Sequence, residues 1–364
     1  MLENPAGYFL RKLSERRKLC LLPITRLSAD TPVLLADDLI YYPENFFETN
    51  LLNVVWEPKR EFENLVYKNS VMHPSVVEVA GVELHWMKSA VTQVSASDFF
   101  SEGLLAFPID MDWNTFLAPI SHEFHLSLIS KAASQVEKLL NLIRFDYCRI
   151  DLMETLPGKA GLMRNSSLSS ALFYTLDDHE SYIIAGDVVR HAFVAGIGLQ
   201  IDGCKVRSFA GGEVYNIASH ALQMHTDALE ASNYTAKFIN LINLLDYLAE
   251  PFDFLGMAKA KGRIARHIAR STEEYEKVIE DFKFLTSKIN GLGNNIGLRH
   301  NIIHTGARIE ELLSAHEVKD VLRRMDRYAS AVIEDLLEMS TKQWSDVETL
   351  RLQKGKKLGL DGNL

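Results

Sequence analysis

The character of the sequence changes within residues 202–213, where Gly203, Gly211 and Gly212 cluster. Before this point the chain holds short β-branched or aromatic runs separated by Pro, Gly and paired Asp residues, a pattern typical of strands joined by loops. After it, apolar residues recur at helical spacing in nearly every segment. A chain of 364 residues also exceeds the usual size of one domain. We therefore expect two domains of different class that meet near these glycines.

The first region, residues 1–205, is predicted to have an α+β fold. Strand-like runs occupy residues 33–36, 54–56, 76–79, 82–86, 149–153, 171–175 and 182–184, and an apolar helical stripe occupies residues 120–145. Residues 6–28 are expected to begin with an amphipathic helix that carries Arg11, Lys12, Arg16, Arg17 and Lys18. These cations form a solvated face or, in the alternative interpretation, contact a nucleic acid or a membrane.

The second region, residues 206–345, is predicted to be an all-α helical bundle. Residues 235–249 form one apolar helix, and two capping boxes, at 271–274 and 314–317, mark the starts of two more. Asn294 or Asn295 is the expected N-cap of a short helix that follows a glycine-rich break. Residues 346–364, with three lysines and three glycines, are expected to form a basic flexible tail.

The charge distribution limits where an anionic partner can bind. The net charge is −9, and residues 1–205 carry −8 of it, with 18 Lys and Arg against 26 Asp and Glu. A polyanion would therefore meet a local basic patch in the nearly neutral second region. Cys20, Cys148 and Cys204 are far apart and form no Cys-x-x-Cys, which favours reduced thiols in a cytoplasmic protein. No apolar run approaches the roughly 18 residues of a membrane span, so no membrane partner is expected.

Residues 297–306, with the sequence GLRHNIIHTG, hold an arginine and a histidine separated by four residues. His300 and His304 stack on one helical face, with Arg299 on its flank, because each residue turns a helix by about 100°. An imidazole can transfer a proton near neutral pH, and a guanidinium can stabilise a charged phosphorus centre. The set suits attack of a ribose 2′-hydroxyl on its neighbouring phosphate, which needs no metal. On spacing alone, a surface arginine beside a core histidine is the commoner explanation.

The region around this segment resembles the HEPN superfamily, a helical bundle with an Arg-x4-6-His motif near the start of a late helix. A polar residue follows the arginine in that family; here it is His300, where Asn or Ser is more common. Gly306 comes shortly after the histidine, and the apolar, basic and closing helices follow the family's order over residues 215–340. The likeness is greatest to the Apea-like and abortive-infection branches.

The resemblance implies a metal-independent endoribonuclease that works as a homodimer, with the motifs of two copies in one cleft and no cofactor. It also implies products with 2′,3′-cyclic phosphate and 5′-hydroxyl ends. Carried over by position, Arg299 would bind the phosphate, His304 would be the acid or base, and His300 would support them. A role in anti-phage defence or as a toxin is implied too. Residues 1–205 would then be a regulatory or sensor domain, with a phage-derived trigger or an antitoxin as a further partner.

A basic stretch points to an RNA partner independently of the family. Five cations lie within 12 residues that include no acid: Lys259, Lys261, Arg263, Arg266 and Arg270. All but Lys261 fall on one helical face, which suits a phosphate track, although a solvated face is the simpler interpretation. We expect these residues, together with Asn301 in the motif, to contact RNA.

Other interpretations stay open. The helical region can instead be a non-catalytic dimerisation or nucleotide-binding module, with the function in the N-terminal region. The histidine pairs His122 with His125 and His220 with His225 lack a completing cysteine or carboxylate. We expect structural or surface roles for them and predict no metal site.

Overall fold

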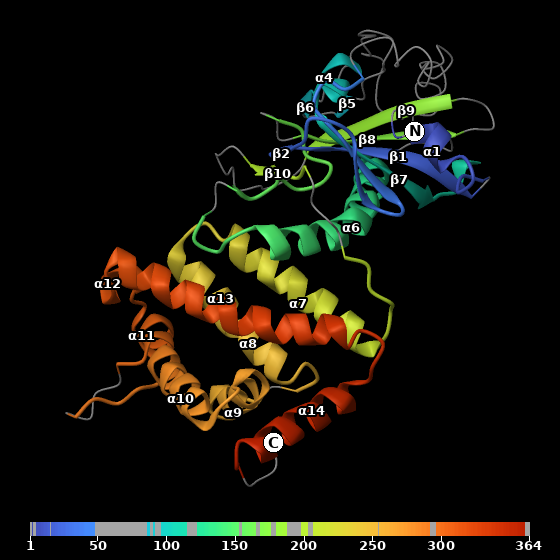
Figure 1. Cartoon of the computed structure of the whole chain (residues 1–364). Helices are drawn as coiled ribbons and strands as arrows, with labels where there is room; N and C mark the ends of the chain where they lie inside the picture. The colour runs from blue at the N-terminus through green and yellow to red at the C-terminus, as the bar shows by residue number, and fades with distance from the viewer. Residues whose placement is uncertain are drawn as a thin grey trace. The chain divides into compact units, whose positions relative to one another are not determined.

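The computed structural model describes residues 2, 5–14, 16–47, 86–87, 90–91, 96–114, 122–152, 155–164, 168–175, 180–187, 198–202, 207–253, 255–291 and 296–360. The chain forms two compact units: Met1–Ile143 with Glu154–Arg207, and Arg144–Met153 with Ser208–Leu364 (Figure 1). The predicted boundary after residue 205 lies close to the change of unit at Arg207. The membership of Arg144–Met153 in the helical unit was not predicted.

An antiparallel sheet organises the first unit, with the strand order β3-β4-β7-β1-β8-β9. Its strands are β1 (Arg17–Ile24), β3 (Val33–Ala36), β4 (Leu39–Tyr42), β7 (Gly103–Asp110), β8 (Leu168–Thr175) and β9 (Glu180–Asp187). The short strands β2 (Leu27–Ser28) and β10 (Leu199–Gln200) pair in parallel, and β5 (Trp86–Met87) pairs antiparallel with β6 (Ala90–Val91). The N-terminal unit thus contains the expected mixture of strands and helices.

Strand β1 is buried on both faces of this sheet. Cys20 and Leu22 belong to one apolar cluster, which includes Ile129 of α6 (His122–Tyr147). Leu19 and Leu21 belong to a second cluster, which includes aromatic residues of α1 (Pro5–Phe9) and α4 (Ala96–Ser101). Because successive strand side chains point to opposite faces, a strand covered on both sides is a continuous apolar run.

This burial explains the errors in the N-terminal prediction. The expected amphipathic helix is wrong beyond Phe9, because Lys18 lies in β1 and is buried. Neither β1 nor β7 has the alternating pattern of a half-buried strand, so both were missed.

The predicted strand runs have mixed outcomes. Residues 33–36, 171–175 and 182–184 lie in β3, β8 and β9, and the predicted helix 120–145 corresponds to α6. The strand predicted at 149–153 is wrong, because a turn with an isolated bridge between Arg149 and Leu152 occupies it. Residues 54–56, 76–79 and 82–85 lie outside the described residues.

The second unit is mostly helical, as expected (Figure 1). Its helices are α7 (Glu213–Glu230), α8 (Tyr234–Ala249), α9 (Met257–Ile268), α10 (Thr272–Thr286), α11 (Leu298–Thr305), α12 (Ile309–Leu312), α13 (Ala315–Glu338) and α14 (Trp344–Lys357). Helix α8 packs against α7, α9 and α13, and most of its apolar side chains are buried. Ser314 and Glu317 form the predicted capping box. Ser271 caps α10, but Glu274 accepts from the Arg270 backbone instead of from Ser271.

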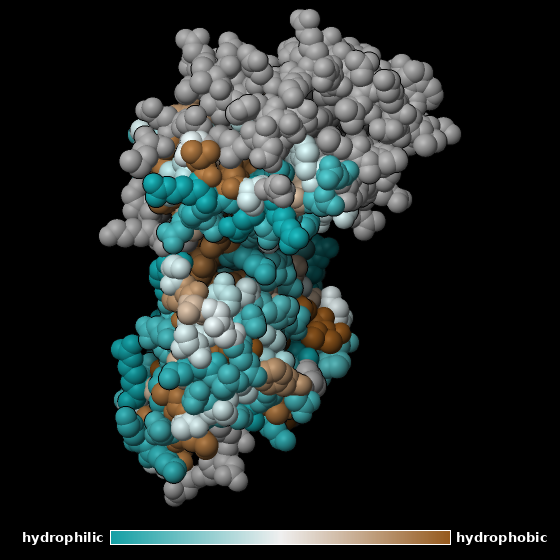
Figure 2. Space-filling view, turned by 90° about the vertical axis from the view of Figure 1, so that its right-hand side faces the viewer, coloured by the Kyte–Doolittle hydropathy of each residue, from teal (hydrophilic) through white to brown (hydrophobic). Residues whose placement is uncertain are grey.

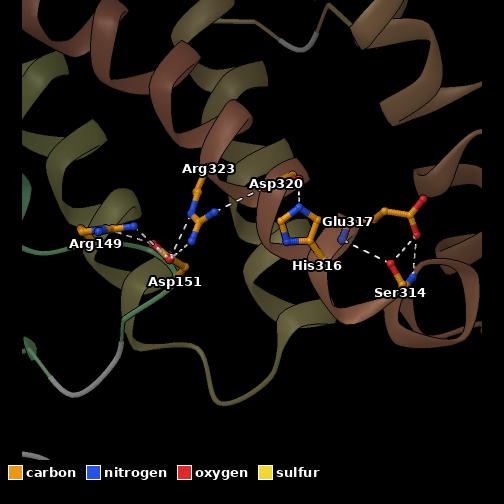
Figure 3. Close-up of polar contacts among 7 residues, drawn as sticks. All are labelled: Arg149, Asp151, Ser314, His316, Glu317, Asp320 and Arg323. Atoms are coloured by element: carbon orange, nitrogen blue, oxygen red, sulfur yellow. Dashed lines mark hydrogen bonds and ion pairs between the residues drawn. The ribbon is translucent and has the colours of Figure 1, made fainter.

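Residues 144–153 are held in the helical unit by a buried carboxylate. Asp151, whose side chain is 2% exposed, accepts hydrogen bonds from Arg323 Nη2 of α13 at 2.7 Å and from Arg149 Nη2 at 3.2 Å (Figure 3). Burial raises the pKa of Asp151, but the bond from Arg323 and the nearby positive charges together lower it below its ordinary value. Arg323 also reaches Asp320 of its own helix, so this ion pair belongs to a small network.

The flexible tail predicted at residues 346–364 is wrong up to Lys357, because these residues form helix α14. The side chain of Arg351 is fully buried and donates to the carbonyl oxygens of Leu248 and Ala249, both at 2.7 Å. These carbonyls end α8, where a helix has no internal partners for them. A lysine-rich and glycine-rich composition suggested a solvated segment, but one buried arginine anchors it.

One face of the helical unit is seen in Figure 2. On the face seen in Figure 2, hydrophilic residues predominate and the hydrophobic ones form small separate groups. Within the described part of the chain, no helix has the length and apolar character needed to cross a bilayer.

We predict that Arg351→Met destabilises the protein by about 3 kcal/mol, because it removes the 2.7 Å bonds to the carbonyls of Leu248 and Ala249 and leaves Ala249 only the longer bond from Arg263 at 3.4 Å. Urea unfolding followed by circular dichroism measures this change. Lys356→Met, at an exposed position of the same helix, is the control and should stay within about 0.5 kcal/mol of the parent. Equal stability of the two variants would contradict the anchoring role of Arg351.

Candidate active site at helix α11

Two glycines set the bounds of α11, which holds the predicted motif. Gly297 is the N-cap, and a Cβ there would lie 2.5 Å from the backbone of Thr286 and Ser287, so no larger residue fits. Gly306 ends the helix in the left-handed conformation with φ of 73°, which glycine adopts without strain. The prediction of Asn294 or Asn295 as the N-cap is wrong, because the close approach to α10 places the cap at Gly297.

The two histidines of the motif lie together, away from the buried side of α11. Leu298 and Ile302 are buried and attach the helix to the bundle. The rings of His300 and His304 have centroids 4.8 Å apart at an angle of 46°, as helical spacing requires. His300 is half-buried and His304 is exposed, so the outer imidazole is accessible to a substrate.

Arg299 has a half-buried acidic neighbour, Asp246, that sequence reasoning missed. Burial raises the pKa of Asp246 in α8, and the positive charge of Arg299 opposes that rise. Arg299 Nε and Asp246 Oδ1 are both buried and make no hydrogen bond within the described structure. The two side chains therefore interact through their charges, and each still has an atom that can form a hydrogen bond. Buried polar atoms without partners are uncommon, and a functional site is one reason for keeping them.

The sequence did contain a signal for Asp246. It is the single acid among the apolar residues of the segment 241–248, where it follows Leu245 directly. A lone carboxylate in an otherwise buried helix requires a partner. Which cation serves as that partner depends on how α8 and α11 pack.

Asn301, predicted to contact RNA, has a local structural role. Its Nδ2 donates to the carbonyl oxygen of Gly297 at 3.1 Å, so the side chain bonds the first turn of its own helix. This bond counts against its assignment as an RNA contact.

Part of the predicted phosphate track on α9 is covered by other residues of the helical unit. Arg263 is 14% exposed, forms an ion pair with Glu250 and lies 3.6 Å from Glu348 of α14. The aliphatic part of Arg266 faces Gly355 of α14, where an added Cβ would approach Arg266 Cδ to 3.4 Å. Helix α14 thus covers the middle of the stripe.

The remaining predicted cations are distributed differently. Lys259 is exposed, Lys261 is half-buried, and Arg270 is exposed but lies beyond the end of α9 at Ile268. The cations available to a polyanion on this side are therefore Lys259, Arg270 and part of Lys261.

The second pair of histidines is structural. His225 is buried, and its Nε2 lies 2.7 Å from Asp326 Oδ1 of α13. The ring of His220 packs edge-on against Tyr247, with centroids 4.8 Å apart. Within the described residues no group of three potential ligands is placed to hold a metal ion. The side chains of His122 and His125 lie outside the described ones.

Exposed aliphatic side chains occur on the motif helix and on the segments before and after it in the chain. Ile303 of α11 is 48% exposed, and Ile289, Ile296 and Leu312 on the flanking segments are 67%, 40% and 36% exposed. The backbone N–H of Ile296 bonds the carbonyl of Lys288, which brings the chain on both sides of the break together. A group of exposed aliphatic residues beside polar ones is typical of a protein interface.

The arrangement at α11 combines an exposed imidazole, a second imidazole beside it and a cation near the half-buried carboxylate of Asp246. Such groups can move protons and stabilise an anionic phosphorus centre. No protein-family model matches the chain, and neither does any curated protein or solved structure.

We predict that Arg299 and Asp246 are coupled energetically. In a double-mutant cycle on unfolding free energy, Arg299→Met and Asp246→Asn should couple by about 0.5–1 kcal/mol, because each change removes the other's countercharge. A cycle of Arg299→Met with Glu338→Gln, an exposed acid at the end of α13, is the control and should show additivity. Additivity in both cycles would disprove the coupling.

Proposed function

We propose that the protein is a metal-independent endoribonuclease of the HEPN type, with its active site at α11. The observation that carries this proposal is the exposed His304 ring, 4.8 Å from His300, on a helix that also presents Arg299. In the reaction, the ribose 2′-oxygen bonds to phosphorus as a base removes its proton. The bond from phosphorus to the 5′-oxygen breaks, and an acid protonates that oxygen. The products carry a 2′,3′-cyclic phosphate and a 5′-hydroxyl.

The residues of α11 have separate roles in this proposal. His304 acts as the acid or base because its ring is exposed to a substrate. His300, half-buried beside it, supports that ring. Arg299 stabilises the negative charge that builds up on the phosphate, and Asp246 positions the guanidinium without bonding it.

The proposal includes a homodimer, since two motifs in one cleft supply an acid and a base together. The exposed Ile289, Ile296, Ile303 and Leu312 around α11 support this, because burying them in a dimer brings two copies of the motif helix close together. RNA is the substrate, and Lys259 and Arg270 remain as exposed cations for its backbone.

Control of the nuclease is assigned to the N-terminal unit. An unrestrained ribonuclease would degrade its host's RNA, so we propose that residues 1–205 sense a phage-derived trigger or bind an antitoxin. A cytoplasmic role in anti-phage defence or as a toxin accords with such control.

We predict cleavage of labelled RNA by the full chain in the presence of EDTA. His304→Ala and Arg299→Ala should each lower the rate by at least about 100-fold, since each removes a group that acts on the reacting phosphate. His316→Ala, at a histidine that is 83% exposed on α13, is the matched control and should retain the rate. Mass spectrometry of the fragments identifies the cyclic phosphate.

The outcomes of this assay separate the proposal from its alternative. Equal cleavage by the parent and His304→Ala would mean that the nuclease activity comes from elsewhere. If the protein neither cleaves nor binds RNA under any condition, a non-catalytic dimerisation module is favoured. The exposed aliphatic residues on and near α11 also suit that function.

We predict that Ile303→Glu weakens dimerisation and lowers cleavage together, because a charge buried at the proposed dimer interface opposes association. Analytical ultracentrifugation measures the monomer–dimer equilibrium. Leu352→Glu, at a leucine that is 36% exposed on α14, is the control and should leave the equilibrium unchanged. If Ile303→Glu dimerises with the same affinity as the parent protein, the dimer interface lies elsewhere.

A further inference from the structure

A polar pocket lies where α9, α13 and α14 meet, formed by residues that take no part in the proposed cleavage chemistry. Its volume is about 350 Å³, within the range of small-molecule sites. The pocket is lined by His267, Ile268, Ala269, Arg270, Ala331, Asp335, Lys354, Lys357 and Leu358.

The floor of this pocket is a fixed hydrogen-bonded network. His267 Nε2 lies 3.0 Å from Asp335 Oδ2, and its Nδ1 accepts from Arg351 Nε at 3.0 Å. Lys354 donates to the same Asp335 oxygen at 2.9 Å and to the carbonyl oxygen of His267 at 2.6 Å. His267 therefore carries its proton on Nε2 and is neutral. Burial lowers its pKa to about 4, although the bond to Asp335 acts in the opposite direction.

The rim of the pocket carries cations with no bonding role in the fold. The side chains of Arg270 and Lys357 are exposed, and neither forms an ion pair within the described residues. Glu274, four residues along the chain from Arg270, accepts from the backbone N–H of Arg270 at 2.9 Å. Among the lining residues, three cations face one carboxylate, which leaves a net charge of +2.

The helix ends around the pocket do not oppose an anion as strongly as free helix ends would. The C-terminal carbonyl groups of a helix carry partial negative charge. Here the His267 carbonyl at the end of α9 is bonded by Lys354, and the Leu358 carbonyl after α14 accepts from the Thr272 hydroxyl at 3.2 Å. Apolar wall residues, such as Ile268 and Leu358, leave room for an uncharged body next to the anionic group.

We infer that this pocket binds a phosphate monoester, either a free mononucleotide or the 5′-terminal phosphate of an RNA. A dianionic phosphate matches the net charge of +2, and Arg270 can bind it bidentately while Lys357 acts as a point charge. The neutral His267 and the bonded Asp335 keep the floor rigid, so the ligand enters a site that is already formed. The inference does not depend on cleavage at α11.

Isothermal titration calorimetry tests the proposal on the full-length His304→Ala variant, so that RNA probes remain intact. The probes are AMP, inorganic phosphate, and one short oligoribonucleotide with either a 5′-phosphate or a 5′-hydroxyl. The double variant Arg270→Ser, Lys357→Ser should weaken binding of the phosphate monoesters by about 10- to 100-fold. The matched control, Lys277→Ser with Lys356→Ser, removes two exposed cations outside the pocket and should bind as the parent does.

The probes distinguish the two sources of the phosphate. Tighter binding of the 5′-phosphorylated oligonucleotide than of AMP identifies an RNA end, and comparable binding identifies a mononucleotide site. The inference is overturned if none of the monoesters binds, if both double variants lose affinity equally, or if the 5′-hydroxyl oligonucleotide binds as tightly as its phosphorylated form. Because all samples carry His304→Ala, a failure here is separate from a failure of the cleavage assay.

Discussion

Cations from one helix bond the free carbonyl groups at the end of another, and the helical unit depends on these contacts. The buried Lys237 donates to the carbonyls of Ala228 and Leu229 at the end of α7. Arg351 bonds those at the end of α8, and Lys354 bonds the carbonyl of His267 in α9. Each helix leaves its last carbonyls unsatisfied, and inside a bundle water cannot reach them. These side chains therefore donate hydrogen bonds to the free backbone carbonyls, and the same bonds fix which helix packs against which.

Such contacts affect the ionisation of the groups that make them. Burial lowers the pKa of Lys237 to about 8 and that of Arg351 to about 10, because the charged forms lose their hydration. The pKa of Asp335 is also lowered, to about 2, but for a carboxyl group this favours the charged form, since His267 and Lys354 bond its carboxylate. The network that anchors α14 also forms the floor of the pocket beside it. One set of bonds thus serves both the fold and the proposed phosphate site.

The candidate active site differs from this well-bonded interior. Arg299 and Asp246 are near each other but leave a buried nitrogen and a buried oxygen without hydrogen bonds among the described residues. His304 is exposed on a helix of eight residues that begins and ends at glycines. Exposed aliphatic residues flank the same helix. In the proposed function, these unsatisfied groups are the ones that a substrate and a second copy of the chain would cover.

The sequence alone determined the features that depend on local spacing. The change from strands to helices near residue 205, the caps at Ser271 and Ser314, and the shared face of His300 and His304 follow from periodicity and capping chemistry. Only the tertiary structure decided which faces are covered. It turned Arg263 toward Glu250 and placed Arg299 near Asp246. It also made α14 a helix anchored by Arg351 instead of a tail. Spacing defines the face of a helix, whereas the neighbour that packs on that face comes from a distant part of the chain.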